Sequence, residues 1–129
     1  AITLEDVLAE HPGTDPLVIH LGTNGWWPNS SEDYGALLDS MPRRTIVLVN
    51  VRVDRAYEAL ANEDLQRLAE ERSNVTLADW NAVATPDRLR SDGFHPTLDG
   101  YAALADVIAN ALKLNPAFEL RPTVTVSQS

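Results

Sequence analysis

The sequence predicts an α/β fold with three layers, in which helices cover both faces of a parallel β-sheet. Three short segments, residues 17–21, 45–51 and 75–79, are apolar almost throughout. Strands of this kind are typically buried on both faces of a sheet. Amphipathic helical patterns alternate with them, which is typical of parallel sheets. Ligands of such sheets bind beyond the carboxyl ends of the strands.

Length and composition fit one soluble globular domain. The chain has 129 residues, of which 44% are hydrophobic and 22% charged. Its net charge of −9 disfavours nucleic acid as a partner, since the phosphate backbone would be repelled. There are no cysteines, and no spacing of histidine and acidic residues matches a metal site. We therefore expect neither a metal nor another cofactor.

Helices are expected at four places. Residues 3–10 form a short amphipathic pattern, residues 32–41 a second, and a third runs from about Asn62 to Arg72. A longer helix begins after Thr97, which is placed to cap it. Its expected buried stripe consists of Tyr101, Leu104, Ala105, Ile108 and Leu112. Trp80 is expected in the core, and residues 115–129 are expected to form a frayed tail.

A histidine and an aspartate follow the third predicted strand. Asp92 precedes His95 by three residues across a turn that contains Gly93. Histidine is a general base near neutral pH, and a carboxylate on its Nδ1 side would fix the tautomer that leaves Nε2 to accept a proton. On its own, this pattern also fits an ordinary turn before a helix.

A glycine-rich turn follows the first predicted strand. Gly22 permits close approach of the backbone, and the Asn24 side-chain amide can donate to a developing oxyanion. An ordinary Asn-Gly turn has the same sequence. Together the two loops are stronger evidence for a functional site than either is alone, because they would leave the same edge of one sheet.

These motifs resemble those of the SGNH, or GDSL-type, hydrolases. Gly22-Thr-Asn24 matches the Gly-x-Asn block of that family, and Asp92-Gly-Phe-His95 matches its final Asp-x-x-His block. The sequence around them, including residues 47–51, Asn62 and residues 78–80, is similar to the SGNH domain attached to bacterial membrane O-acyltransferases. The resemblance covers about residues 1–114, which we interpret as the domain, with residues 115–129 as a C-terminal tail.

The resemblance implies a flavodoxin-like fold and a serine esterase or O-acyltransferase acting on acetyl-type esters of carbohydrate or cell-wall polysaccharide. It makes His95 the base, Asp92 its partner and Asn24 an oxyanion donor, with Gly22 shaping the loop. It also implies an extracellular or cell-surface location, in a protein that a membrane segment could anchor. The expected partner is an acylated carbohydrate or another small ester.

The nucleophile of that family is missing. Its Gly-Asp-Ser motif ends the first strand of the family's sheet, and this sequence contains no such motif. We therefore expect a C-terminal part of the fold, with the serine supplied from outside the chain and little esterase activity without it. Residues 17–21 would then lie at an open edge. The expected neighbours, in order, are an upstream segment, the tail around residues 123–126, and a second copy. If that tail forms a strand, Ser127 or Ser129 could supply the hydroxyl.

The aromatic residues are also compatible with a second function, carbohydrate binding. Trp26 and Trp27 follow the oxyanion loop and could stack on sugar rings, although at least one is expected to pack under the loop. His20, within an apolar strand, is expected to be a hydrogen-bonded core histidine. The alternative to an enzyme is a non-catalytic carbohydrate-binding relic of the fold. A phosphate-binding module is weaker, since residues 22–31 contain no lysine and no P-loop pattern.

Overall fold

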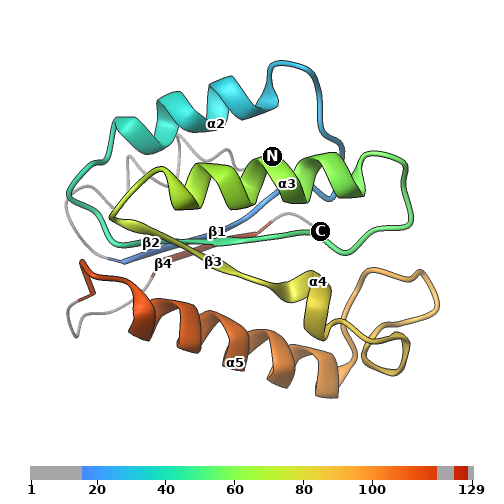
Figure 1. Cartoon of the computed structure of the whole chain (residues 1–129). Helices are drawn as coiled ribbons and strands as arrows, with labels where there is room; N and C mark the ends of the chain where they lie inside the picture. Colours follow the sequence, from blue (N-terminus) through green and yellow to red (C-terminus); the bar gives the residue numbers. More distant parts are fainter. Residues whose placement is uncertain (1–15, 119–123, 128–129) are drawn as a thin grey trace.

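A computed structural model of the chain describes residues 16–118 and 124–127. Within them lies a four-stranded sheet with helices on both faces (Figure 1). The three-layer α/β prediction is therefore confirmed. The helix expected over residues 3–10 and the possible role of Ser129 lie outside the described residues.

All strand pairings in the sheet are parallel. The strands are β1 (Leu17–His20), β2 (Ile46–Val49), β3 (Val75–Ala78) and β4 (Val124–Ser127), in the order β3-β2-β1-β4. The first three coincide with the apolar segments of the sequence, each trimmed at one or both ends. Their carboxyl ends lie at one edge of the sheet, on the right in Figure 1, where the loops before α4 and α5 also lie.

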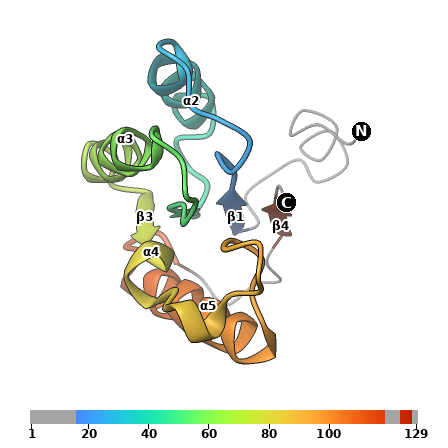
Figure 2. The ribbon, with the colours of Figure 1, turned by 90° about the vertical axis from the view of Figure 1, so that its right-hand side faces the viewer.

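Two helices pack on one face of the sheet, and one long and one short helix pack on the other. Helices α2 (Ser30–Asp39) and α3 (Glu58–Glu70) lie on one face, and α5 (Leu98–Leu114) with the short α4 (Trp80–Val83) lies on the other (Figure 2). A 3-10 turn, η1 (Pro86–Arg88), joins α4 to the loop before α5. Helix α3 begins at Glu58, earlier than the predicted start near Asn62. The Asn62 side chain bonds to both backbone groups of Val51.

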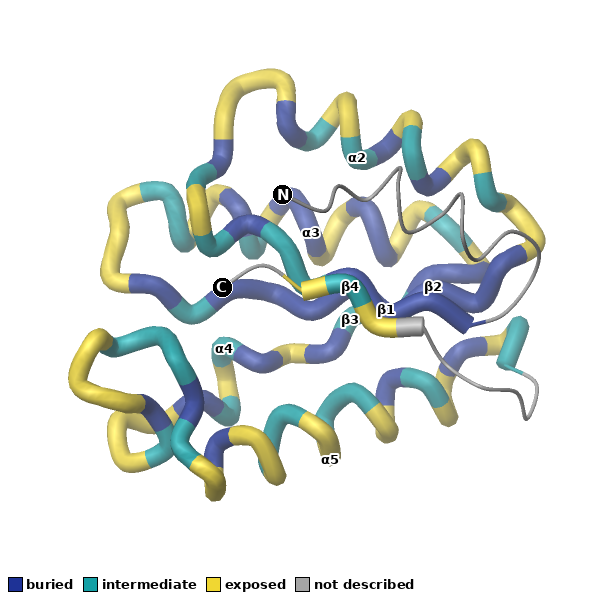
Figure 3. The backbone as a smooth tube through the Cα atoms, turned by 180° about the vertical axis from the view of Figure 1, so that it is seen from behind, coloured by how far each residue is buried: buried dark blue, intermediate teal, exposed yellow. Residues whose placement is uncertain are grey.

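The core has two parts, one on each side of the sheet. Leu17 and Ile19 of β1 pack towards α2 and α3, whereas Val18 packs towards α5. The central strand β2 is buried along its whole length (Figure 3). Trp80 is 1% exposed and lies on the α5 side, in the core as predicted. Side chains therefore alternate between the two cores along β1, as the pleat requires.

The buried face of α5 differs from the predicted stripe. Tyr101 is 51% exposed and Ala105 is exposed as well. The residues that pack on the sheet are Ala103, Leu104, Val107, Ile108, Ala111 and Leu112. In the first turn, Gly100 is buried close to the backbone of Arg88, where a side chain would not fit.

The tail corrects two expectations. Residues 124–127 are a strand rather than a frayed end, and this strand pairs with β1 in parallel, from Leu17 with Val124 to His20 with Ser127. On this side β1 pairs with the tail, the second of the three expected neighbours, rather than with the upstream segment expected first. The prediction that this strand has a neighbour on each side is confirmed. The apolar β1 explains the pairing, since an open edge there would expose unpaired backbone groups.

Candidate active site

A small cavity lies at the carboxyl edge of the sheet, on the α5 side. It has a volume of about 100 Å³. It is lined by His20, Thr23, Arg52, Trp80, Phe94, His95, Pro96, Tyr101, Leu104 and Ser127. Drug-sized ligand pockets begin at roughly 300 Å³, so this cavity suits a small group rather than a whole sugar.

The loop that carries His95 is held tightly at both ends. Leu89 and Pro96 form an antiparallel bridge, and the Arg90 amide donates to the His95 carbonyl at 2.7 Å. Gly93 turns the chain between them with φ +80°, a conformation that side chains disfavour. Thr97 then caps α5, as predicted, by accepting from the Gly100 amide. The loop therefore presents His95 from a fixed backbone.

Asp92 holds the His95 ring from within the same loop. Its Oδ1 accepts from the backbone N–H groups of Phe94 (3.0 Å) and His95 (2.9 Å), and its Oδ2 contacts His95 Nδ1. The Phe94 ring lies against the imidazole with centroids 4.3 Å apart. The arrangement leaves Nε2 as the ring nitrogen not engaged by Asp92.

The same contacts keep Asp92 ionised. Hydrogen bonds from the Phe94 and His95 backbone amides, and then from the His95 ring, lower the pKa of Asp92 to about 2. Asp92 is therefore a carboxylate throughout the neutral and mildly acidic range. A carboxylate in this position can stabilise the imidazolium that forms when Nε2 takes a proton.

His20 is the second histidine of the cavity. Its Nε2 is buried and has no hydrogen-bond partner among the residues that the structure describes, so the predicted hydrogen bonding is not met at this ring nitrogen. Burial lowers the pKa of His20 to about 4, so the ring is neutral at neutral pH. The cavity thus contains a buried polar atom available to a ligand.

The lowered pKa of His20 predicts acid-sensitive stability. The neutral form stabilises the fold fully above pH 6.5, the unfolded value, and this stabilisation is lost as pH falls from 6.5 towards 4. We expect urea denaturation to show a loss of about 2 kcal/mol over this window that His20→Gln lacks. Arg52, His95 and Tyr101 line the same cavity, so His95→Gln is the control. An identical pH dependence in wild type and His20→Gln would contradict the prediction.

The turn after β1 is built as its glycines suggest. Gly22 and Gly25 have φ of +109° and +143°, and a Cβ on Gly22 would lie 3.1 Å from Val51 Cγ1. The Tyr57 hydroxyl donates to the Thr23 carbonyl at 2.7 Å and holds the turn. Thr23 lines the cavity, whereas Asn24 is exposed beside it and is not among the lining residues. Its role as an oxyanion donor stays a prediction.

Asparagine side chains organise the loop after β2. Asn62 bonds to the Val51 amide and carbonyl, and Asn81 donates to the same carbonyl. Arg52 follows directly, lines the cavity and lies 3.6 Å from a Glu58 carboxylate oxygen. These contacts bring one cation to the cavity wall.

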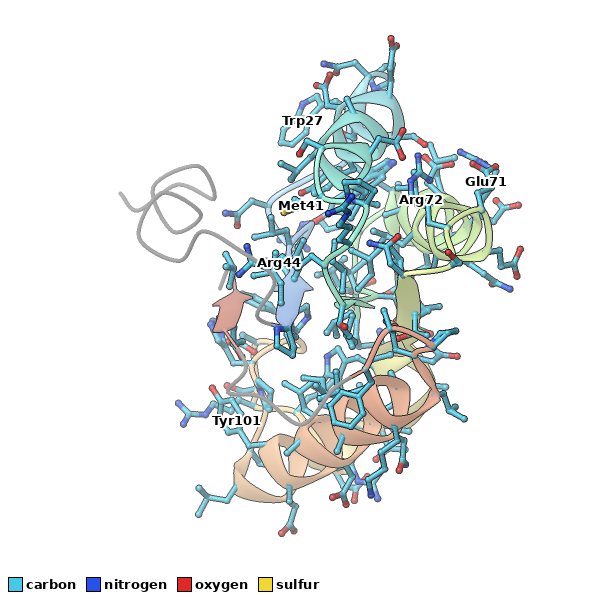
Figure 4. The ribbon with its side chains drawn as sticks, turned by 90° about the vertical axis from the view of Figure 1, so that its left-hand side faces the viewer. Trp27, Met41, Arg44, Glu71, Arg72 and Tyr101 are labelled. Atoms are coloured by element: carbon cyan, nitrogen blue, oxygen red, sulfur yellow. The ribbon has the colours of Figure 1, made fainter. Side chains whose placement is uncertain are left out.

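The two neighbouring tryptophans lie in different surroundings. Trp26 is buried, stacks on Tyr34 and donates from Nε1 to Asp64 at 2.7 Å, so its ring is not free to bind sugar. This corrects its assignment as a substrate-binding residue and fulfils the expectation that one indole packs inside. Trp27 is 59% exposed. Figure 4 shows Trp27 on the α2 side of the sheet and Tyr101 on the α5 side, so Trp27 lies away from the cavity.

Comparison with curated proteins gives relatives of one kind. The chain is 40% identical over 99 residues to "Putative peptidoglycan O-acetyltransferase YrhL" of Bacillus subtilis (strain 168), and 37% identical over 99 residues to O-acetyltransferase OatA of Staphylococcus aureus (strain NCTC 8325 / PS 47). Each match covers 75% of this chain. The chain belongs to the family of these O-acetyltransferases. The resemblance inferred from the motifs is thereby confirmed.

The matches span only a part of the relatives. They cover 15% of YrhL and 16% of OatA. No family model matches the chain. Within residues 16–118 and 124–127, no helix is long and apolar enough to cross a membrane, and no group of three histidine and acidic side chains is placed to hold a metal ion.

Sequence reasoning missed several cavity residues. The helical pattern assigns Tyr101 to a buried stripe, and it gives Arg52 no role. The sequence makes Ser127 a candidate only if the tail forms a strand. The tail does form one, and Ser127 lines the cavity. The alternation of residues 123–127 is the one signal that could have placed it.

Proposed function

We propose that this chain contributes the histidine–aspartate pair of an acyl-transfer site that moves an acetyl group between an ester and a hydroxyl of cell-wall carbohydrate, with the nucleophilic serine supplied from outside the chain. The observation that carries the proposal is the Asp92–His95 pair, held in a rigid loop beside a small cavity. The relatives named as O-acetyltransferases, one of them for peptidoglycan, support the choice of acyl group and acceptor.

The His95 ring has the chemistry that the reaction needs. Asp92 engages Nδ1, so Nε2 can accept the proton of an attacking hydroxyl and return it to the leaving alcohol. Ionised Asp92 stabilises the imidazolium between these two transfers. Asn24, at the same edge of the sheet, is proposed to donate to the oxyanion once substrate is bound.

The shape of the cavity favours a small acyl group. Its volume of about 100 Å³ and its wall of Trp80, Phe94 and Leu104 suit an acetyl methyl group. Tyr101, half-exposed at the first turn of α5, offers a ring face on which a sugar outside the cavity could stack. An acylated carbohydrate is therefore the proposed substrate, and the cell surface is the proposed location.

The test is transfer of acetyl from p-nitrophenyl acetate to an oligosaccharide of N-acetylglucosamine, followed by mass spectrometry of the sugar. With a Gly-Asp-Ser segment of the family's first strand added to the chain, wild type is expected to add acetyl groups, and His95→Gln is expected to reduce transfer by at least about 100-fold. His11→Gln serves as the control substitution. Transfer that is equal in wild type and His95→Gln would overturn the proposal.

A second candidate function is carbohydrate binding without chemistry. The exposed rings of Trp27 and Tyr101 favour it, because such rings stack on sugars. It predicts that titration with the same oligosaccharide gives equal affinity for wild type and His95→Gln, with no acetyl transfer by either. Loss of affinity in Trp27→Ala or Tyr101→Ala would identify the ring involved.

A further inference from the structure

The wall of the cavity differs in charge from the rest of the molecule. The chain has 19 acidic residues against 10 lysines and arginines, yet none of the described residues that line the cavity is an aspartate or a glutamate. Arg52 lines it together with two histidines, His20 and His95. Since Arg52 contributes a full positive charge, a wall of this composition attracts an anion and disfavours a cation.

Two carboxylates adjoin these lining residues, and both are engaged elsewhere. Asp92 contacts the His95 ring and accepts from two backbone amides of its own loop. Glu58 Oε2 lies 3.6 Å from Arg52 Nη1, which is too long for a hydrogen bond, and accepts from the Val53 amide at 2.7 Å. Within the described part of the chain, the Arg52 guanidinium makes no other ion pair. It therefore has N–H donors left for a ligand.

The backbone on both sides of Arg52 is fixed. Val51 and Val53 are buried. The Asn62 side chain bonds to both backbone groups of Val51, and Glu58 accepts from the Val53 amide. The Arg52 side chain between these two valines is 32% exposed. Its base is thus rigid while its charged end is accessible, and such preorganisation reduces the entropic cost of binding.

We propose that Arg52 binds a carboxylate at this cavity and so selects for anionic ligands. The inference rests on the proposed acyl-transfer function and deepens it, because it names a charged group on the substrate or the product. A planar guanidinium presents paired N–H donors whose spacing matches the two oxygens of a carboxylate. A volume of about 100 Å³ admits a carboxylate and leaves a sugar ring outside, where the half-exposed Tyr101 lies.

Two sources of a carboxylate fit the proposed reaction. A sugar that receives the acetyl group can carry an acidic substituent. Acetate is released when water attacks the acetyl carbonyl carbon in place of the sugar: the water oxygen stays on that carbon, the ester oxygen leaves as the alcohol, and one proton is released. In both cases the buried Nε2 of His20, which has no partner among the described residues, is a further donor when the ring carries its proton there.

The test measures dissociation constants by NMR titration of the isotope-labelled chain, which needs no nucleophile. The probes are N-acetylmuramic acid, which carries a carboxylate, its uncharged methyl ester, and sodium acetate against sodium chloride at equal ionic strength. We expect wild type to bind the acid about 10-fold more tightly than the ester, and Arg52→Gln to bind the two equally. Arg52→Lys should keep part of the preference, because an ammonium group retains the charge and loses the paired donors.

Two further variants separate ligand binding from a structural ion pair. Arg43 is exposed in the turn before β2, at the opposite end of the strands, so Arg43→Gln removes the same charge elsewhere and should keep the full preference. Glu58→Gln keeps an oxygen for the Val53 amide and removes the charge that competes for Arg52, so it should bind the acid at least as tightly as wild type. Weaker binding by Glu58→Gln, or an equal preference in wild type and Arg52→Gln, would overturn the inference.

The probes also distinguish the two sources. Tighter binding of N-acetylmuramic acid than of acetate assigns the site to a sugar carboxylate, and the reverse assigns it to released acetate; each supports the inference when Arg52→Gln abolishes the binding. If the chain with the added serine segment transfers acetyl and wild type shows no carboxylate preference, the proposed function stands and the inference is wrong. If the preference is present and transfer is absent, the role of Arg52 stands and the proposed function fails.

Discussion

Replacement of Asp92 by asparagine is expected to lower the acyl-transfer rate by roughly 10²–10⁴-fold. The amide oxygen can still accept from the Phe94 and His95 backbone amides, so the loop keeps its shape. The amide NH₂ would face His95 Nδ1, and a donor there favours the tautomer that carries its proton on Nε2. Such a ring cannot take a proton from a hydroxyl at Nε2.

Steady-state hydrolysis of p-nitrophenyl acetate by the chain with the added serine segment measures this effect. The loss should appear in kcat, and the unfolding midpoint should change little because Asp92 is exposed. Asp99→Asn, an exposed substitution in the first turn of α5, is the control for loss of one negative charge. Equal rates in Asp92→Asn and Asp99→Asn would show that the Asp92 carboxylate does not serve His95.

Gly100→Ala is expected to destabilise the fold by about 3 kcal/mol, at the upper end of the range for overpacking. A Cβ at this position would lie 2.1 Å from the Arg88 carbonyl oxygen and 2.9 Å from Pro96 Cβ. Neither the backbone of Arg88 nor the ring of Pro96 can turn away as a flexible side chain can. The helix and the His95 loop would have to separate.

Urea denaturation of Gly100→Ala and Gly35→Ala tests this directly. A Cβ on Gly35 in α2 meets only the ends of long side chains, at 3.2 Å from Arg72 Nη2 and 3.4 Å from Leu68 Cδ2. Alanine is the better helix former by up to about 1 kcal/mol, so Gly35→Ala should be neutral or stabilising. Similar stabilities of the two variants would mean that the approach of α5 to Arg88 is looser than described.

The sheet could be predicted from the sequence because the apolar composition of its strands indicates that they are buried. Residues 46–49 are apolar and β-branched at nearly every position, which is typical of a strand covered on both faces. The tail gave a weaker signal, since the five alternating residues 123–127 are compatible with a strand and with a frayed end. The pairing with the edge of β1 decides between them. This contact joins segments far apart in the chain, so the local sequence could not indicate it.

The site was predictable where its geometry is local. Asp92 and His95 lie three residues apart in one turn, so the sequence contains their contact. The cavity was not predictable, because Ser127, Arg52 and Tyr101 reach it from distant parts of the chain. For the two tryptophans, the sequence predicts that one indole is buried but not which one, because the hydrogen-bond partner of Trp26 lies on α3, far away in the chain.

The pairing of β4 with β1 joins residues about a hundred positions apart, and this has a consequence for the order in which the molecule comes apart. Closing so long a loop carries an entropic cost that no local helix or turn shares, and β4 is held by one neighbouring strand over only four residue pairs. Such a strand is drawn from the low end of local stability, so it opens well before the central strands do. That partial opening would uncover the edge of β1 and remove the cavity wall to which Ser127 belongs, before the rest of the sheet melts.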